Sequence, residues 1–228
     1  MFATAETKLW RTASEVNEAM VRVYNHMFMA IVTSGVVSYL VSTSPGLMAF
    51  FFTGWMKWVT VFAPLAFVFL VPILLNSGIS RIGKILTLHS FAGVMGLSMA
   101  TIFVVYTMGS IVSAFMGAAI LFGTMSLYGY FTKQSLDNIG KWCFVGLIAI
   151  VIASIINLFI GSTVAQMVIS SLAIVIFLGL TAYDTQNIRE MVSEHTDDSV
   201  EISGALSLYL NFINLFISLL QLFGGKKE

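Results

Sequence analysis

Long apolar runs leave this chain very few folds to adopt. A membrane-spanning helix needs about 20 mostly apolar residues, and the sequence contains seven such runs separated by short polar connections. Lipid offers no water to satisfy backbone groups, so a run of this length forms a helix rather than an isolated strand. We therefore predict an all-α integral membrane protein, a seven-transmembrane-helix bundle. The predicted spans are Val21–Ser44, Trp55–Asn76, Gly83–Tyr106, Ser110–Phe131, Trp142–Ile160, Val164–Gln186 and Gly204–Phe223.

Composition supports this class and excludes others. Of the 228 residues, 58% are hydrophobic and 10% charged, against about 25% charged residues in soluble domains. The formal net charge of +0 provides no basic field for nucleic acid. We find no Gly-rich phosphate loop, paired-histidine zinc helix or nucleophile elbow, so we expect neither an enzyme nor a bound cofactor.

Basic residues predict the orientation in the membrane. Those on one side of the predicted spans are Lys8, Arg11, Arg22, Arg81, Lys84, Lys133, Lys141 and Arg189, whereas the alternate loops hold Lys57. The positive-inside rule then makes residues 1–20 a cytoplasmic tail, followed by a transmembrane domain over 21–223 and a C-terminal tail over 224–228. Lys226 and Lys227 are an exception to this pattern. Seven complete spans would place them outside, against the positive-inside rule, whereas a re-entrant last segment would place them inside. We favour seven complete spans.

Asp184 is the only acidic residue within the seven predicted spans of the sequence. A carboxylate at that depth is expensive unless it faces a bundle interior, a water-filled cavity or a partner. Asp184 is therefore the first candidate for a functional residue.

The last span carries a polar stripe. Its members follow spacings of four, three, four and three, and they are Ser207, Asn211, Asn214, Ser218 and Gln221. Such spacing places them on one side of a helix, which should face other helices rather than lipid. We therefore expect this helix to be central. An interhelical hydrogen-bond seam and a water or ion path both remain open as readings of the stripe.

Asp184 and Asn211 should lie at similar depth if the last two spans run antiparallel across a cytoplasmic loop. A carboxylate facing an amide carbonyl, with Thr181 and Ser207 one turn away, offers hard oxygen ligands for Ca²⁺ or another small cation. Burial favours the neutral acid and a nearby cation favours the carboxylate, so such a site can respond to pH. The acidic loop Glu190–Glu201 is predicted to be solvated, and it could concentrate cations at the cytoplasmic mouth.

Three segments resemble the Bax inhibitor-1 family, also called the transmembrane Bax inhibitor motif family. They are Phe122–Leu136 (FGTMSLYGYFTKQSL), Ala182–Ile188 (AYDTQNI) and Ala205–Leu220 (ALSLYLNFINLFISLL). The resemblance covers essentially all seven spans. It implies a fold with the last helix at the centre, a pH-sensitive Ca²⁺ leak and, given the short loops, a bacterial inner-membrane protein.

The resemblance also assigns roles to residues. In bacterial members a pair of aspartates on the sixth and seventh helices shares a proton and gates the pore; the first falls on Asp184 and the second on Asn211. One carboxylate and one amide cannot share a proton in this way, so we expect a leak that is weaker for Ca²⁺ and less sharply pH-dependent. Some members have an arginine that latches to the pair, for which Arg81 is the nearest candidate.

A second hypothesis is that the protein conducts little and acts by contact. Some bacterial relatives resemble regulators of a membrane-bound ATP-dependent protease, and eukaryotic ones modulate cell death. The charged segment Met1–Arg22 would then be the contact region, although an ordinary solvated flank explains it as well.

Overall fold

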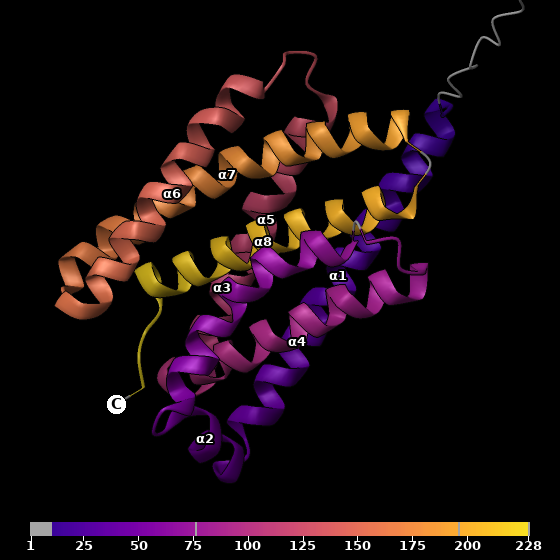
Figure 1. Cartoon of the computed structure of the whole chain (residues 1–228). Helices are drawn as coiled ribbons and strands as arrows, with labels where there is room; N and C mark the ends of the chain where they lie inside the picture. The colour runs from indigo at the N-terminus through magenta and orange to yellow at the C-terminus, as the bar shows by residue number, and fades with distance from the viewer. Residues whose placement is uncertain (1–10, 76, 196, 228) are drawn as a thin grey trace, which may run out of the picture.

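A computed structural model describes residues 11–75, 77–195 and 197–227, and these residues form eight helices without a strand (Figure 1). The helices are α1 (Ala13–Ser42), α2 (Pro45–Phe52), α3 (Met56–Leu75), α4 (Arg81–Val105), α5 (Met108–Phe131), α6 (Asp137–Ile160), α7 (Thr163–Glu194) and α8 (Asp198–Phe223). Seven of them are long and apolar enough to cross a membrane, and the eight-residue α2 is the exception. The predicted all-α membrane fold is confirmed.

Several helices extend beyond the predicted spans. The first begins at Ala13, where Thr12 and Glu15 form a capping box, so the segment predicted as a polar tail is helical from Ala13 onward. Residues 1–10 of that tail, and Asn76 at the end of the second predicted span, lie outside the described residues. Likewise α7 continues to Glu194 and α8 begins at Asp198. Apolar runs mark the part of a helix within lipid, whereas capping and side-chain pairing carry the helix further.

Prolines have different effects in the two places where they occur. Pro45 follows the first span and starts α2, because Ser44 caps that helix and proline fits its first turn. Pro64 and Pro72 lie within α3, which continues through both of them.

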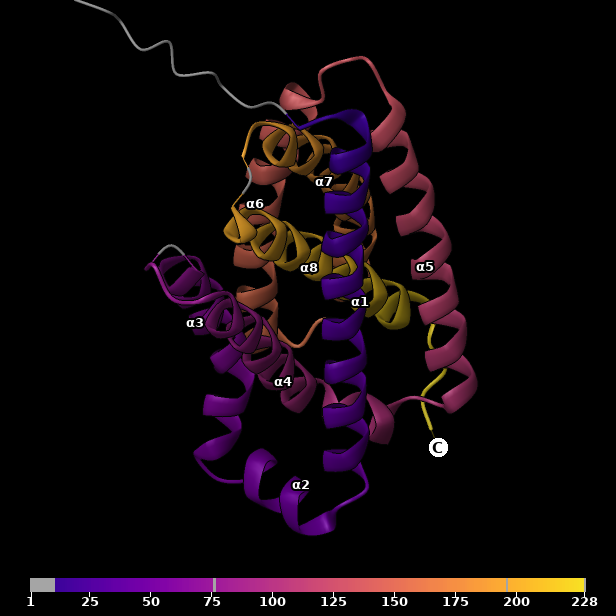
Figure 2. The ribbon, with the colours of Figure 1, turned by 90° about the vertical axis from the view of Figure 1, so that its right-hand side faces the viewer.

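The last helix, α8, lies at the centre of the bundle. It packs against α1, α3, α4, α5 and α7, and Figure 2 shows α1 in front of it, α5 on one side and α3 with α4 on the other. In its most apolar stretch 61% of residues are buried, against 11–33% in the other six long helices. The outer helices instead expose large apolar side chains, as lipid contact requires. The predicted central position is confirmed.

The C-terminal segment packs along the loop between α4 and α5. Thr107 donates its backbone N–H to Gly225 O at 3.1 Å, and Lys227 donates its backbone N–H to Val105 O at 2.9 Å. Because α8 runs for 26 residues from the α7–α8 connection, these residues lie at the opposite end of the bundle from that connection.

Candidate functional site around Asp184

The structure brings Asp184 and Asn211 together between α7 and α8. The Asn211 Nδ2 donates to Asp184 Oδ2 over 2.6 Å, a short, charge-assisted hydrogen bond when the carboxylate is ionised. Asn211 is 4% exposed and Asp184 is half-buried. Antiparallel packing of the two helices matches their depths, as the sequence predicts.

The orientation of the Asn211 amide differs from the prediction. Its NH₂ group, rather than its carbonyl oxygen, faces the carboxylate. The ionised Asp184 needs a donor, and the NH₂ group supplies one, whereas two facing oxygens would repel each other. In this arrangement Asn211 stabilises a charged Asp184 and is not positioned to share a cation with it.

The remaining residues of the predicted polar path have varied surroundings. Thr181 is fully buried and donates to Phe177 O within its own helix, at 2.7 Å. Asn214 similarly donates to Leu210 O at 2.8 Å. Ser218 is buried and Ser207 half-buried. These four residues lie on α7 and α8 as predicted, but the hydrogen bonds of Thr181 and Asn214 stay within their own helices.

The far end of the polar stripe also contacts α7. Gln221 Oε1 accepts from Gln166 Nε2 at 2.8 Å and from Ser170 Oγ at 2.9 Å. With the Asp184–Asn211 bond at the other end, the stripe follows the α7–α8 interface rather than lipid. An interhelical seam is thus present at both ends of the stripe.

Arg81 does not contact Asp184. It is the first residue of α4, and its Nη1 lies 3.2 Å from Oδ1 of Asp198, the first residue of α8. The contact that the latch prediction requires is therefore not formed in this structure, because α4 directs Arg81 to the start of α8 instead of to the acid on α7.

The segment Glu190–Glu201 is not simply a solvated acidic loop. Lys84 Nζ lies 3.4 Å from Asp197 Oδ1 and also contacts the Ser199 hydroxyl. Hydrogen bonds from the hydroxyl and the backbone N–H of Ser199, together with Lys84, hold the pKa of the Asp197 carboxyl below its ordinary value. Together with Arg81–Asp198, this pair fixes the α7–α8 connection to the start of α4.

Glu201 is a buried acid that the sequence analysis missed. Its side chain is 3% exposed. Arg22 of α1 donates from Nη2 to Glu201 Oε1 at 2.7 Å and from Nε to Oε2 at 2.8 Å, and Arg11 Nη1 lies 3.3 Å from Oε1. Arginine's planar fork matches a carboxylate in this bidentate geometry. Glu201 precedes the last apolar run, so its burial gave no signal in hydropathy; its pairing joins α1 to the beginning of α8.

A hydrogen-bonded chain next to Asp184 was also missed. The Tyr24 hydroxyl lies 2.5 Å from Ser126 Oγ, and Ser126 Oγ lies 3.1 Å from Thr185 Oγ1. These contacts link α1, α5 and α7 immediately beside the candidate site. Ser126 and Thr185 belong to two of the quoted segments, which is the signal that could have identified them.

The described part of the chain contains no group of three or more His, Cys, Asp or Glu side chains able to hold a metal ion. Ca²⁺ takes six to eight oxygen ligands. One carboxylate and one amide supply only part of that set.

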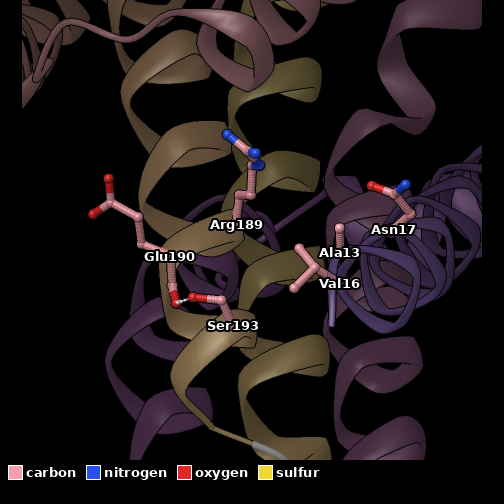
Figure 3. Close-up of a pocket in the computed structure, with 6 residues that line it drawn as sticks. All are labelled: Ala13, Val16, Asn17, Arg189, Glu190 and Ser193. Atoms are coloured by element: carbon pink, nitrogen blue, oxygen red, sulfur yellow. Dashed lines mark hydrogen bonds between the residues drawn. The ribbon is translucent and has the colours of Figure 1, made fainter. Parts of the chain in front are cut away.

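A pocket of about 160 Å³ lies between the start of α1 and the end of α7 (Figure 3). Its lining residues are Ala13, Val16, Asn17, Arg189, Glu190 and Ser193. Arg189 is held over the ring of Tyr130, 4.9 Å from its centre, and donates to Tyr130 O at 3.1 Å. Arg189 is five residues beyond Asp184, or about 7.5 Å along the helix. The pocket therefore lies nearer the α7–α8 connection than Asp184 does.

Sequence comparisons find similar bacterial membrane proteins over nearly the whole chain. The model of a family described as "Inhibitor of apoptosis-promoting Bax1" matches residues 16–228. The inner membrane protein YbhL of Escherichia coli is 36% identical, with 91% of this chain and 92% of the relative covered. An uncharacterized membrane protein of Streptococcus pyogenes is 35% identical, with 93% and 96% covered. An uncharacterized protein of Borreliella burgdorferi is also 35% identical, with 93% and 94% covered.

Proposed function

This chain belongs to the Bax inhibitor-1 family, and from that membership we propose that it is a channel through which Ca²⁺ leaks down its gradient across the membrane. The observation that carries the proposal is the carboxylate of Asp184, hydrogen-bonded to Asn211 between two membrane-crossing helices. An ionisable group at such a position is costly, and it marks an ion or proton pathway more often than a structural contact.

Asn211 stands where the family resemblance implies a second aspartate. Two carboxylates that share one proton carry a net charge of −1 and are joined by an O–H···O bond. An ionised Asp184 with Asn211 also carries −1, but its N–H···O bond holds no proton that can leave. At neutral pH the Asp184–Asn211 pair therefore has the same charge and a similar hydrogen bond to a proton-sharing pair, but it has no shared proton to lose. This explains the weaker pH response that we expect.

Ca²⁺ passage requires a change at this bond. A cation approaching Asp184 competes with the Nδ2 donor of Asn211, and it gains a second oxygen ligand if the amide turns to present Oδ1. Protonation of Asp184 removes the charge that attracts the cation. Acid is therefore expected to reduce Ca²⁺ binding at the site.

We assign the ion route to the α7–α8 interface. Ser170, Phe177 and Asp184 recur every seven residues and so share one face of α7. Ser170 bonds Gln221 at one end of this face and Asp184 bonds Asn211 at the other. Phe177, which is 5% exposed, lies between the two polar ends. A phenyl ring at this level would close the route by excluding water.

The orientation of the protein is part of the proposal. The clustered basic residues support a cytoplasmic N-terminus and a cytoplasmic α7–α8 connection. The family match to the Escherichia coli inner membrane protein supports a location in a bacterial inner membrane. Asp184 would then lie in the cytoplasmic half of the bilayer.

The test is Ca²⁺ entry into indicator-loaded liposomes that contain the purified protein. We expect the parent to exceed empty liposomes, and Asp184→Asn to lower entry by roughly tenfold, as the loss of one charge-assisted interaction predicts. Asp137→Asn is the matched control, since Asp137 is exposed at the start of α6. It should leave entry unchanged.

Two outcomes would overturn the proposal. If the parent conducts no more than empty liposomes, the leak is ruled out, and action by contact with a membrane protein such as a protease becomes the better hypothesis. If Asp184→Asn and Asp137→Asn behave alike, ions pass elsewhere and the Asp184–Asn211 bond is structural.

A further inference from the structure

A cavity of about 100 Å³ lies at the other side of α8 from the candidate channel site. It is bounded by α1, α4, α5 and α8, and its lining is mostly apolar, including Met99, Phe103, Phe115 and Phe216. Helices α1 and α5 both border this cavity, and each of them packs on α8. Several lining side chains are half-buried or exposed, so the cavity is accessible from the bilayer.

Ser38 makes the cavity chemically distinctive. Among the described residues, Ser38 Oγ is the buried side-chain polar atom without a hydrogen-bond partner, and Ser38 is 2% exposed. Ser34, which also lines the cavity, is satisfied by Ala92 O at 2.8 Å and by the Tyr209 hydroxyl at 2.6 Å. A buried hydroxyl in an apolar setting is costly when unpaired. Ser38 therefore leaves one unpartnered hydroxyl in the wall of the cavity.

Two lysines lie at the rim of the cavity. Lys227 Nζ donates to the backbone oxygen of Phe103, a lining residue, at 2.7 Å. The backbone of Lys226 forms an isolated antiparallel β-bridge with that of Tyr106. Both lysines are exposed. The N-terminus of α5, which begins at Met108, adds the positive end of a helix dipole nearby. Among the described residues, two lysines of the C-terminal segment thus lie next to the apolar cavity.

We propose that this cavity and its rim bind an anionic phospholipid. An acyl chain occupies the apolar cavity, a glycerol ester carbonyl accepts a hydrogen bond from Ser38, and the phosphate lies beside Lys226 and Lys227. Depth agrees with this arrangement, because Ser38 precedes the end of α1 by four residues, or about 6 Å. Ester groups lie at a comparable depth below the headgroups.

The proposal also accounts for the one discrepancy in the charge pattern. Because α8 is a complete span, Lys226 and Lys227 lie at the end of the bundle where the predicted loops otherwise contain Lys57. Backbone and side-chain bonds hold the lysine segment against α4, so its position is specified by the fold. A lipid site gives these lysines a local role that is independent of topology.

Native mass spectrometry of the full chain tests the proposal, with phosphatidylglycerol and phosphatidylcholine of identical acyl chains. We expect the parent to retain phosphatidylglycerol preferentially. Lys226→Gln with Lys227→Gln should remove that preference, by about fivefold for each lysine. Lys57→Gln is the control for each single lysine, because it removes one positive charge at the same end of the bundle, where Lys57 lies over Trp58.

Ser38→Ala provides a second and different readout. Loss of one hydrogen bond should weaken retention of both lipids by about fivefold while leaving the preference for phosphatidylglycerol unchanged. The proposal is overturned if the parent shows no preference, if the double lysine variant keeps it, or if Ser38→Ala changes neither lipid. It is also overturned if a second copy of the chain, rather than lipid, accompanies the parent. None of these outcomes bears on Ca²⁺ entry.

Discussion

Replacing Asn211 with aspartate would restore a pair of carboxylates at the candidate site. The Asn211 Nδ2 and the Asp184 Oδ2 are 2.6 Å apart, so the new carboxylate oxygen would meet Asp184 at about that separation. Two unit charges at this distance repel each other by about 6 kcal/mol at an effective dielectric constant of 20. That cost exceeds the roughly 4 kcal/mol that separates an ordinary aspartate pKa of about 3.9 from neutral pH. The pair in Asn211→Asp therefore holds one proton at neutral pH.

The retained proton should make the variant more sensitive to pH than the parent. As pH rises from 6 to 8, Ca²⁺ competes more effectively with the shared proton for the two carboxylates. The pair then approaches a charge of −2. We expect Ca²⁺ entry at subsaturating Ca²⁺ to rise more steeply with pH in Asn211→Asp than in the parent. Ca²⁺ binding should also release about one proton from the variant, because a cation displaces the proton from a shared site.

Both effects can be measured on one preparation. Ca²⁺ entry into liposomes at pH 6, 7 and 8 gives the pH profile, and a weakly buffered solution with a pH indicator reports proton release in detergent. Asn138→Asp is the control, since it adds the same group at an exposed position on α6. Identical pH profiles for the parent and Asn211→Asp, with no proton release from either, would refute the reasoning that position 211 determines proton sharing.

Two further predictions concern stability, measured as the free energy of unfolding in detergent. Glu201→Gln should lower it by about 2–3 kcal/mol. This is less than the cost of breaking a fully buried ion pair, because the Arg22 side chain is 38% exposed and can be hydrated once its partner is lost. A loss below about 0.5 kcal/mol would contradict a stabilising role for the Arg22–Glu201 pair. Gly129→Ala should cost about 1–3 kcal/mol, because its Cβ would lie 2.2 Å from the backbone oxygen of Ala182. Gly123→Ala, where a Cβ meets nothing within 4 Å, should instead be neutral or stabilising, so equal losses at the two glycines would count against close packing of α5 on α7.

The ion pairs at the start of α8 bear on how a central helix is held. Glu201 binds Arg22 of α1, and Asp198 binds Arg81 of α4, so the beginning of α8 is tied to two neighbouring helices. These contacts lie on the same side of the bundle as Asp184, near the α7–α8 connection. A displacement of α8 at that end would have to separate these pairs first.

Much of the fold could be predicted from the sequence alone. An apolar run of about 20 residues has one stable backbone in lipid, so seven runs predict seven helices. The polar stripe from Ser207 to Gln221 similarly predicts that the last helix is central, because those side chains cannot face lipid. The proximity of Asp184 and Asn211 followed from antiparallel helices of known rise per residue.

Only the tertiary structure decided which charged and polar groups meet. Arg22 and Glu201 are 179 positions apart, and their pairing depends on how α1 and α8 are rotated about their axes. Helix packing and side-chain torsions likewise decide that Arg81 meets Asp198 rather than Asp184, that the Asn211 NH₂ group faces the carboxylate, and that Ser38 is unpaired beside a cavity. Hydropathy and helical spacing are properties of one segment at a time, so they fix how each helix forms. The contacts between helices depend on side-chain packing across the whole bundle, which no single segment contains.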